Sequence, residues 1–343
     1  MKPAILSWGI LATGGIANTF ARGVAASQTG RLAAVGSRTP ESAARFAREH
    51  GVPRAHGSYE ALLADPEVQA VYVSPPHPFH AEWAIRAAAA GKHVLCEKPL
   101  AMNRAGAERI VAAAQTHGVL LMEAFMYRCH PQTAKVVELV RNGSLGRVGL
   151  VQAAFSFHAA FKPEGRHWGK ALGGGGILDV GCYPVSLARL IAGAVDGRPF
   201  ADPVSITGAG RLHPQTGVDA YAAATLKFGG GMIAQVSCGV GLQQDNAARI
   251  YGDQGWLLVP EPWVPAREGG TVQILLNRAG AAPQEISISA PPLYAIEADT
   301  FAAALFAGAK SVPAMTPEDT LGNMAALDAW RAAIGLSYDA DKV

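Results

Sequence analysis

The chain has 343 residues, of which 50% are hydrophobic and 16% charged, a composition typical of a globular protein large enough for two domains. The formal net charge is +2 and no long basic run or arginine stripe occurs, which argues against nucleic acid as a partner. No uninterrupted apolar stretch predicts a membrane span and the N-terminus lacks the cleavage site of a signal peptide, so we expect a cytoplasmic protein without a membrane partner.

Short apolar runs alternate with helical stretches over the first third of the chain. This alternation predicts parallel strands joined by crossover helices, hence an α/β, doubly wound Rossmann sheet, which we place at residues 1–124. The expected strands cover residues 4–11, 31–37, 70–74, 93–97 and 119–124, and the expected helices cover residues 16–27, 40–50, 58–64, 79–91 and 104–118.

Longer runs with strand character follow after about residue 124. With few helices to cover them, mainly 178–192 and two late ones, they predict a C-terminal α/β domain, residues 125–343, with an open-faced, mainly antiparallel sheet. An open apolar face often becomes a subunit interface, so we expect a homodimer or homotetramer. The last helix, 316–335, is expected to pack back between the domains. The expected strand runs are 146–161, 204–212, 219–241, 247–259, 271–276 and 285–290.

A glycine-containing turn follows the first apolar run. Residues 12–17 fit the dinucleotide fingerprint G-x-G-x-x-G with alanine at the first and third glycine positions, and the first of these is a departure. The following helix offers free N–H groups to a diphosphate, although a simple tight turn is an alternative interpretation. The predicted cofactor-binding residues here are Ala12, Thr13, Gly14, Gly15 and Ile16.

The second expected strand ends in Ser37 and Arg38. An NAD enzyme usually carries an acid here that binds the ribose 2′-hydroxyl, whereas a guanidinium suits a 2′-phosphate. We therefore predict NADP rather than NAD as the cofactor. A solvated loop arginine is the alternative.

The expected strand at 70–74 leads into a proline-rich turn at the carboxyl edge of the sheet, where open α/β folds bind ligands. We place Ser74, Pro75, His77 and His80 beside the cofactor. The two histidines have a spacing that suits a metal, but no cluster of further ligands accompanies them, so no metal is expected. The four cysteines are scattered without a Cys-x-x-Cys pair, which argues against a zinc site or a disulfide framework.

The expected strand at 93–97 ends in Glu97, Lys98 and Pro99. Proline restricts the residue before it to extended conformations, so the direction of the lysine is fixed. Near a cationic nicotinamide the pKa of Lys98 would be lowered, and its amine could hold or polarise a substrate oxygen. The alternative is a surface lysine beside an unrelated proline. Glu97 and Lys98 also belong to the predicted cofactor contacts.

A run of four glycines at 173–176 precedes Asp179 and Tyr183. The glycines allow a flexible loop that approaches other groups closely. One helical turn separates the two polar residues, so a carboxylate and a phenol could bind adjacent hydroxyls of a sugar or diol. Pro184 limits this geometry because it implies a kink or a helix start nearby. A capping aspartate and a half-buried tyrosine remain an alternative.

Taken together, these motifs resemble the glucose-fructose oxidoreductase/inositol dehydrogenase/MocA (Gfo/Idh/MocA) family over nearly the whole chain. The similar stretches are WGILATGGIA, CEKP and GGGGILDVGCYP, while EAFMYRCHPQ and YAIEADTFAAAL look like the branch with aldose 1-dehydrogenases and dimeric dihydrodiol dehydrogenases. The resemblance implies hydride transfer between nicotinamide C4 and a sugar or polyol carbon.

The resemblance also implies roles for individual residues. Lys98 would be the catalytic lysine, Asp179 a ligand of substrate hydroxyls and Tyr183 the acid/base, its pKa lowered by Lys98 and the nicotinium charge. The segment 165–172 fits no pattern of the family, and we expect Arg166 and Trp168 in it to line the substrate pocket with these three residues.

The leading hypothesis is an NADP-dependent aldose 1-dehydrogenase of the D-xylose/D-glucose type. A keto-sugar reductase or a trans-dihydrodiol dehydrogenase would use the same residues. A regulator that senses NADP and a sugar without turnover is the remote alternative, since a fold does not fix a function.

Overall fold

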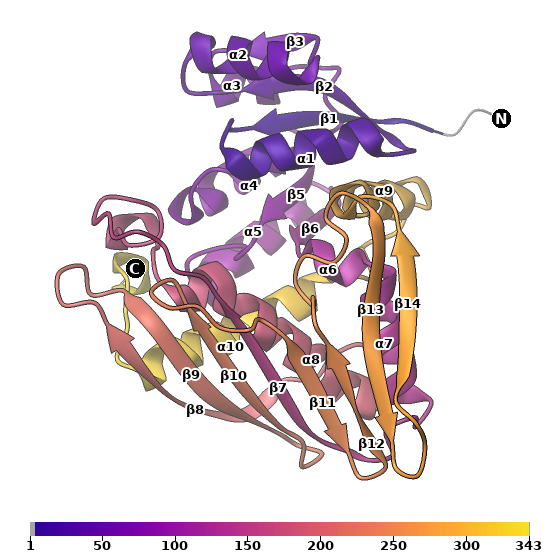
Figure 1. Ribbon diagram of the computed structural model, residues 1–343. Helices are drawn as coiled ribbons and strands as arrows, with labels where there is room; N and C mark the ends of the chain where they lie inside the picture. Colours follow the sequence, from indigo (N-terminus) through magenta and orange to yellow (C-terminus); the bar gives the residue numbers. More distant parts are fainter. Residues whose placement is uncertain (1–3, 343) are drawn as a thin grey trace.

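The computed structural model describes residues 4–342 and divides them between two sheets (Figure 1). The first sheet is parallel, with strand order β3-β2-β1-β4-β5-β6, and helices connect its strands. Its strands are β1 (Leu6–Leu11), β2 (Gly30–Gly36), β3 (Arg54–His56), β4 (Ala70–Val73), β5 (His93–Glu97) and β6 (Leu121–Ala124). Its helices are α1 (Gly15–Ala26), α2 (Pro40–His50), α3 (Tyr59–Leu63), η1 (His77–Phe79), α4 (His80–Ala89) and α5 (Arg104–Thr116).

The second sheet has strand order β14-β13-β12-β11-β7-β10-β9-β8 and is antiparallel except between β7 and β10. Its strands are β7 (Val148–Ser156), β8 (Pro203–Leu212), β9 (Asp219–Phe228), β10 (Ile233–Gly239), β11 (Ala248–Gly252), β12 (Gly255–Val259), β13 (Gly270–Arg278) and β14 (Gln284–Ala290). The helical elements are α6 (Met126–Cys129), α7 (Pro131–Arg141), η2 (Lys170–Leu172), the π-helical η3 (Ile177–Gly181), α8 (Cys182–Val195), α9 (Leu293–Phe306), α10 (Pro317–Ala333) and η4 (Asp339–Lys342).

The fold class predicted from the sequence is confirmed, with two differences in the strands. The edge strand β3 was missed, because its three residues, Arg-Ala-His, show no apolar pattern. The predicted strand run 247–259 contains two strands, β11 and β12, which pair with each other as a hairpin.

Helices α8 and α10 cover one face of the second sheet, and the other face carries no helix within residues 4–342 (Figure 1). The burial pattern of β9 alternates along the strand, as expected when one face is covered. The stretch Lys170–Val195 is long and apolar enough to span a membrane, but its apolar window is completely buried in the fold, as expected of a core helix.

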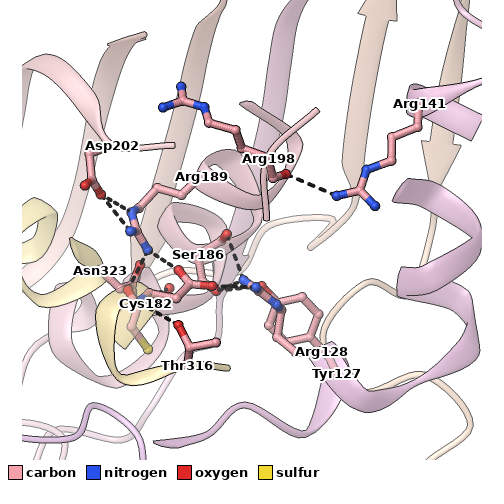
Figure 2. Close-up of polar contacts among 11 residues, drawn as sticks. Tyr127, Arg128, Arg141, Cys182, Ser186, Arg189, Arg198, Asp202, Thr316 and Asn323 are labelled. Atoms are coloured by element: carbon pink, nitrogen blue, oxygen red, sulfur yellow. Dashed lines mark hydrogen bonds and ion pairs between the residues drawn. The ribbon is translucent and has the colours of Figure 1, made fainter. Parts of the chain in front are cut away.

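A buried ionic network fixes α8 against α10 (Figure 2). Arg189 of α8 pairs with Asp202 at 2.6 Å and with Asp319 of α10, and Asp319 also pairs with Arg128 at 2.6 Å. Arg128 in turn donates to Ser186 of α8 at 3.0 Å. Because the carboxylate of Asp319 lies between two buried guanidinium groups, it holds α6, α8 and α10 in one arrangement.

The C-terminal helices connect the two sheets. α9 packs on α1. Its Asp299 accepts hydrogen bonds from the N–H groups of Gln28 and Thr29, which follow α1 in the chain. α10 starts after Thr316, whose hydroxyl accepts from the Asp319 N–H at 3.3 Å. This helix contacts α5 and β6 on one side and α8 and β8 on the other, so it lies between the two sheets.

Candidate functional site

A cleft of about 430 Å³ lies where the carboxyl edge of the parallel sheet faces the second sheet. A larger hollow, about 620 Å³, lies on the open face of the second sheet, but Asp245 and Arg249 are its only ionisable lining residues. The cleft is therefore the better candidate for chemistry. The predicted residues that line it are Gly14, Gly15, Ile16, Ser74, Pro75, His77, His80, Glu97, Lys98, Arg166, Asp179 and Tyr183.

The turn between β1 and α1 leaves room for a bound group. A Cβ atom added to Gly14 or Gly15 would meet nothing within 4 Å, and no side chain caps α1. This arrangement fits the diphosphate of a dinucleotide. Ala12 has a φ of 83°, a backbone conformation that suits glycine, and its N–H donates to the Gly36 carbonyl at 3.0 Å.

Ser37 and Arg38 lie at the same edge, directly after β2. The Ser37 hydroxyl is buried and 3.3 Å from the Thr13 hydroxyl, which ties this turn to the fingerprint turn. Arg38 is exposed, and within residues 4–342 its guanidinium has no carboxylate at ion-pair distance. An unpaired guanidinium at this position fits a 2′-phosphate.

The turn that carries Lys98 is fixed from two sides. The Leu100 N–H donates to Glu123 of β6 at 2.8 Å. His80 is fully buried, and its ring nitrogens lie 2.8 Å from the Pro75 carbonyl and 2.9 Å from the Pro99 carbonyl. Sequence reasoning missed Glu123, although an acid inside an apolar strand was a usable signal.

The amine of Lys98 lies against the segment that contains Asp179. Lys98 Nζ donates to the Asp179 main-chain carbonyl at 2.6 Å and lies 3.4 Å from the Asp179 carboxylate. Burial lowers the pKa of Lys98, but Asp179 and, less strongly, Cys182 and Glu97 raise it more, so the pKa is above its usual value. The amine is therefore cationic at neutral pH, and the lowering of its pKa expected beside a nicotinium stays a prediction for the cofactor complex.

The Asp179 carbonyl lies where the π-helical turn η3 passes into the α-helix α8. Besides the Lys98 amine, it accepts from the Cys182 thiol at 3.7 Å. Pro184 follows in the first turn of α8 and has no N–H to donate. The Asp179 carbonyl therefore brings the lysine amine to the start of α8.

Two cations lie beside the Asp179 carboxylate. Besides Lys98, Arg166 lies 3.5 Å from its Oδ2, and the imidazole of His167 lies 3.9 Å from the same oxygen. Burial raises the pKa of Asp179, but Lys98 and Arg166 lower it more, so its pKa is well below the usual value. Asp179 is thus a permanently ionised hydrogen-bond acceptor, as binding of a hydroxyl group requires.

Tyr183 also faces the cleft, one turn after Asp179. Its hydroxyl lies 3.6 Å from Met126 Sδ, and its ring packs edge-on against Phe155. Lys98 Nζ is 5.1 Å from the centre of the ring. Burial raises the pKa of Tyr183 well above its usual value, and neighbouring acidic groups add to the rise. Tyr183 therefore holds its proton at neutral pH, and the lowering expected from Lys98 together with a nicotinium stays a prediction for the cofactor complex.

The segment 165–172 contributes less to the cleft than expected. The side chain of Arg166 lines it and is 58% exposed. Trp168 does not line it: the indole N–H donates to the Ala159 carbonyl at 3.2 Å, and the ring packs against Phe161 and His213. The prediction that Trp168 lines the substrate pocket is therefore wrong, because these partners hold the indole ring away from the cleft.

Several lining residues were not identified from the sequence. They come from α6, from β7 and the residues after it, from the connection between β12 and β13 and from α9, where no local motif marks them: Met126, Phe155, Phe157, Val264, Arg267 and Tyr294. The aromatic residues in the run 146–161 were the one feature of the sequence that could have indicated part of this lining. Within residues 4–342, no group of three His, Cys, Asp or Glu side chains is arranged to hold a metal ion.

Two family models match the chain. Residues 6–125 match the model described as an oxidoreductase family with an NAD-binding Rossmann fold, and residues 133–258 match the GFO/IDH/MocA C-terminal domain. These matches cover both the cofactor turn and the segment with Asp179 and Tyr183.

Named relatives include trans-1,2-dihydrobenzene-1,2-diol dehydrogenases. The protein of Mus musculus is 35% identical over 262 residues, 76% of this chain and 76% of that protein. The protein of Sus scrofa is 31% identical over 344 residues, 98% of this chain and 99% of that protein.

Among solved structures, KijD10, a 3-ketoreductase from Actinomadura kijaniata in complex with NADP and TDP-benzene, has a TM-score of 0.87 at 30% identity, with 96% of this chain and 98% of that chain covered. Aldose-aldose oxidoreductase from Caulobacter crescentus, complexed with glycerol, has a TM-score of 0.85 at 26% identity, with 96% and 97% covered.

Proposed function

Because the chain belongs to the Gfo/Idh/MocA family of NAD(P)-dependent oxidoreductases, we propose that its cleft transfers a hydride between NADP(H) and a sugar carbon, most specifically C1 of an aldose. One observation carries the proposal: the Lys98 amine, the Asp179 carboxylate and the Tyr183 hydroxyl converge on one cleft. The cleft lies beside the free N-terminus of α1, so cofactor and substrate would meet there.

We assign the residues of the cleft separate tasks. NADP, when bound at Gly14 and Gly15, supplies the hydride acceptor at nicotinamide C4. The cationic Lys98 donates a hydrogen bond to the reacting oxygen and stabilises the negative charge that develops there. Asp179 accepts from a neighbouring hydroxyl and fixes the orientation of the sugar. Tyr183 in its phenolate form takes the proton of the hydroxyl when an alcohol is oxidised, and as a phenol it donates this proton to the oxygen when a carbonyl is reduced.

Two features support NADP as the preferred cofactor. Arg38 is an exposed guanidinium without a carboxylate partner at the end of β2, where a 2′-phosphate would lie. The similar 3-ketoreductase KijD10 is an NADP complex.

A keto-sugar reductase is the second candidate, and the state of Tyr183 favours it. The raised pKa of Tyr183 keeps its proton in place at neutral pH, which suits donation to a carbonyl oxygen. The similarity to a 3-ketoreductase agrees with this direction.

A substrate panel separates these activities. Aldoses, inositols, trans-diols and keto-sugars are each assayed with NADP(H) and NAD(H) by the absorbance of the reduced nicotinamide. We expect oxidation of an aldose with NADP. Reduction of a keto-sugar or oxidation of a trans-diol would replace the aldose assignment, and no turnover across the panel would favour an NADP-binding regulator.

A further inference from the structure

The glycine loop 173–176 is buried behind Asp179 and rests on two groups that do not line the cleft. One is Asp219, the first residue of β9, and the other is Tyr338 in the C-terminal segment. Asp219 is 0% exposed and Tyr338 is 2% exposed. Neither residue has a task in the proposed reaction.

Asp219 holds the end of the loop from which η3 starts. Its Oδ2 accepts from the Ile177 N–H at 2.7 Å, and the Gly176 N–H also interacts with this carboxylate. Gly175 has a φ of 115°, and a Cβ atom added to it would lie 2.2 Å from Asp219 Oδ1. The loop therefore needs glycine there both for its backbone conformation and for its close approach to Asp219.

Tyr338 holds the middle of the loop and connects it to the Lys98 side of the cleft. Its hydroxyl donates to the Gly174 carbonyl at 2.5 Å, and its N–H donates to Asp341 at 2.8 Å. Asp341 also accepts from Asn103 at 3.1 Å and pairs with Arg331 at 2.7 Å. Asn103 caps α5 and follows the Lys98 turn in the chain.

Hydrogen bonds connect the loop to the reacting groups. The Gly175 carbonyl accepts from the Asp179 N–H at 3.4 Å, and the Asp179 carbonyl accepts from Lys98 Nζ at 2.6 Å. A shift of the loop would therefore move both the Asp179 carboxylate and the lysine amine. Misplacement of a reacting group by about 1 Å can cost on the order of 100-fold in rate.

We propose that Asp219 and Tyr338 are positioning residues that hold the glycine loop and thereby fix Asp179 and the amine of Lys98. The proposal rests on the proposed function for the assignment of Lys98 and Asp179 to the reaction. According to this proposal, the C-terminal segment that contains Tyr338 also holds the site in place.

The test compares Tyr338→Phe, Asp219→Ala and Asp219→Asn in the full-length protein. We expect Asp219→Ala to lower kcat by about 10- to 100-fold and Tyr338→Phe by several-fold, while NADP binding stays unchanged because the fingerprint turn is untouched. Asp219→Asn keeps an oxygen acceptor and restores most of the rate. Burial raises the pKa of Asp219 to about 7, so a neutral side chain is tolerated there. Asp339→Asn, an exposed change in the same segment, is the matched control.

A second measurement needs no turnover. Acetylation of Lys98 by acetic anhydride is followed by mass spectrometry in each variant, with the Lys92 peptide as reference, because Lys92 is bound to the Asp65 and Val68 carbonyls elsewhere. Loss of the Asp179 contacts lowers the pKa of Lys98 and speeds its labelling several-fold in Asp219→Ala and Tyr338→Phe. If wild-type protein lacks activity on every sugar, this result still decides the positioning role.

Two results would overturn the proposal. One is an unchanged kcat and unchanged Lys98 labelling in Asp219→Ala and Tyr338→Phe. The other is equal loss in Asp219→Asn and Asp219→Ala together with a matching loss of thermal stability, which indicates a purely structural role. If Asp219→Ala does not fold, kcat and the labelling of Lys98 in Tyr338→Phe and Asp219→Asn test the proposal.

Discussion

At the residue scale, the amine of Lys98 is held by Asp179, through its main-chain carbonyl at 2.6 Å and its carboxylate at 3.4 Å. The place of the lysine was predictable, because the end of an apolar strand and the proline after it are local signals for the carboxyl edge of the sheet. Its partner was not predictable, because Asp179 lies 81 residues further along the chain and no local pattern marks the contact.

Replacement of Lys98 by methionine tests its role in the reaction. Methionine keeps much of the length of the side chain but removes the charge that stabilises the reacting oxygen. We expect kcat to fall by about 100- to 10,000-fold while NADP still binds, as measured by steady-state kinetics and fluorescence titration. Lys135→Met on the surface of α7 is the control, and a near-normal rate in Lys98→Met would remove the catalytic assignment.

Arg38→Ala tests the cofactor preference. A hydrogen bond to a charged group contributes about 1.5–3 kcal/mol, so we expect the Kd for NADP to rise about 10- to 100-fold and the Kd for NAD to stay the same. Both constants come from titration of the intrinsic fluorescence. Arg48→Ala, at the far end of α2, controls for general loss of positive charge, and an equal effect on both cofactors contradicts a 2′-phosphate contact.

At the scale of elements, apolar runs and crossover helices were predictable because both faces of a parallel sheet are covered and its strands are apolar throughout. The three-residue strand β3 was not predictable, because it is placed by its pairing with β2 rather than by its own composition. The position of Trp168 depends on contacts with Phe161 and His213, which are distant in the sequence from each other. Cleft residues from the second sheet were missed for the same reason.

Glu123 makes strand β6 sensitive to pH. Burial raises the pKa of Glu123 to about 7, whereas an unfolded glutamate releases its proton near pH 4.3. Between these values the folded state holds a proton that the unfolded state has lost, so stability falls as the pH rises and is unaffected below pH 4. The difference amounts to roughly 3 kcal/mol.

Glu123→Gln should remove this dependence. The amide oxygen still accepts from the Leu100 N–H, and the side chain stays neutral at every pH. We expect the variant to gain stability relative to wild type between pH 4.5 and pH 7.5, by up to about 3 kcal/mol in urea unfolding. The exposed Glu138→Gln should show no such gain, and a constant difference between Glu123→Gln and wild type across this range would contradict the raised pKa.

At the scale of the whole molecule, the site depends on segments that return from the C-terminus. α9 packs on α1, and α10 lies between α5 and β6 on one side and α8 and β8 on the other. The network of Arg128, Arg189 and Asp319 joins α10 to α8, the helix that contains Tyr183. The capping Thr316 predicts the start of α10. The buried ion pairs of this helix connect residues that are too far apart in the sequence to be predicted from local patterns.

The open face of the second sheet is the surface where we expect a second copy of the chain. The central outward-facing residues of β8, β9 and β10 are uncharged: Thr207, Ala209, Ala223, Thr225, Gln235 and Ser237. Arg211, Tyr221 and Lys227 lie on the same face toward the strand ends. A stable interface buries about 1,200–2,000 Å².

Ala223→Arg places a charge at the centre of this surface, where burial without a partner costs several kcal/mol. We expect wild-type protein to sediment as a dimer or tetramer of the 35.6 kDa chain and the variant as a monomer. Ala281→Arg, in the turn between β13 and β14, should leave the assembly intact, and an unchanged sedimentation coefficient in Ala223→Arg would locate the interface elsewhere.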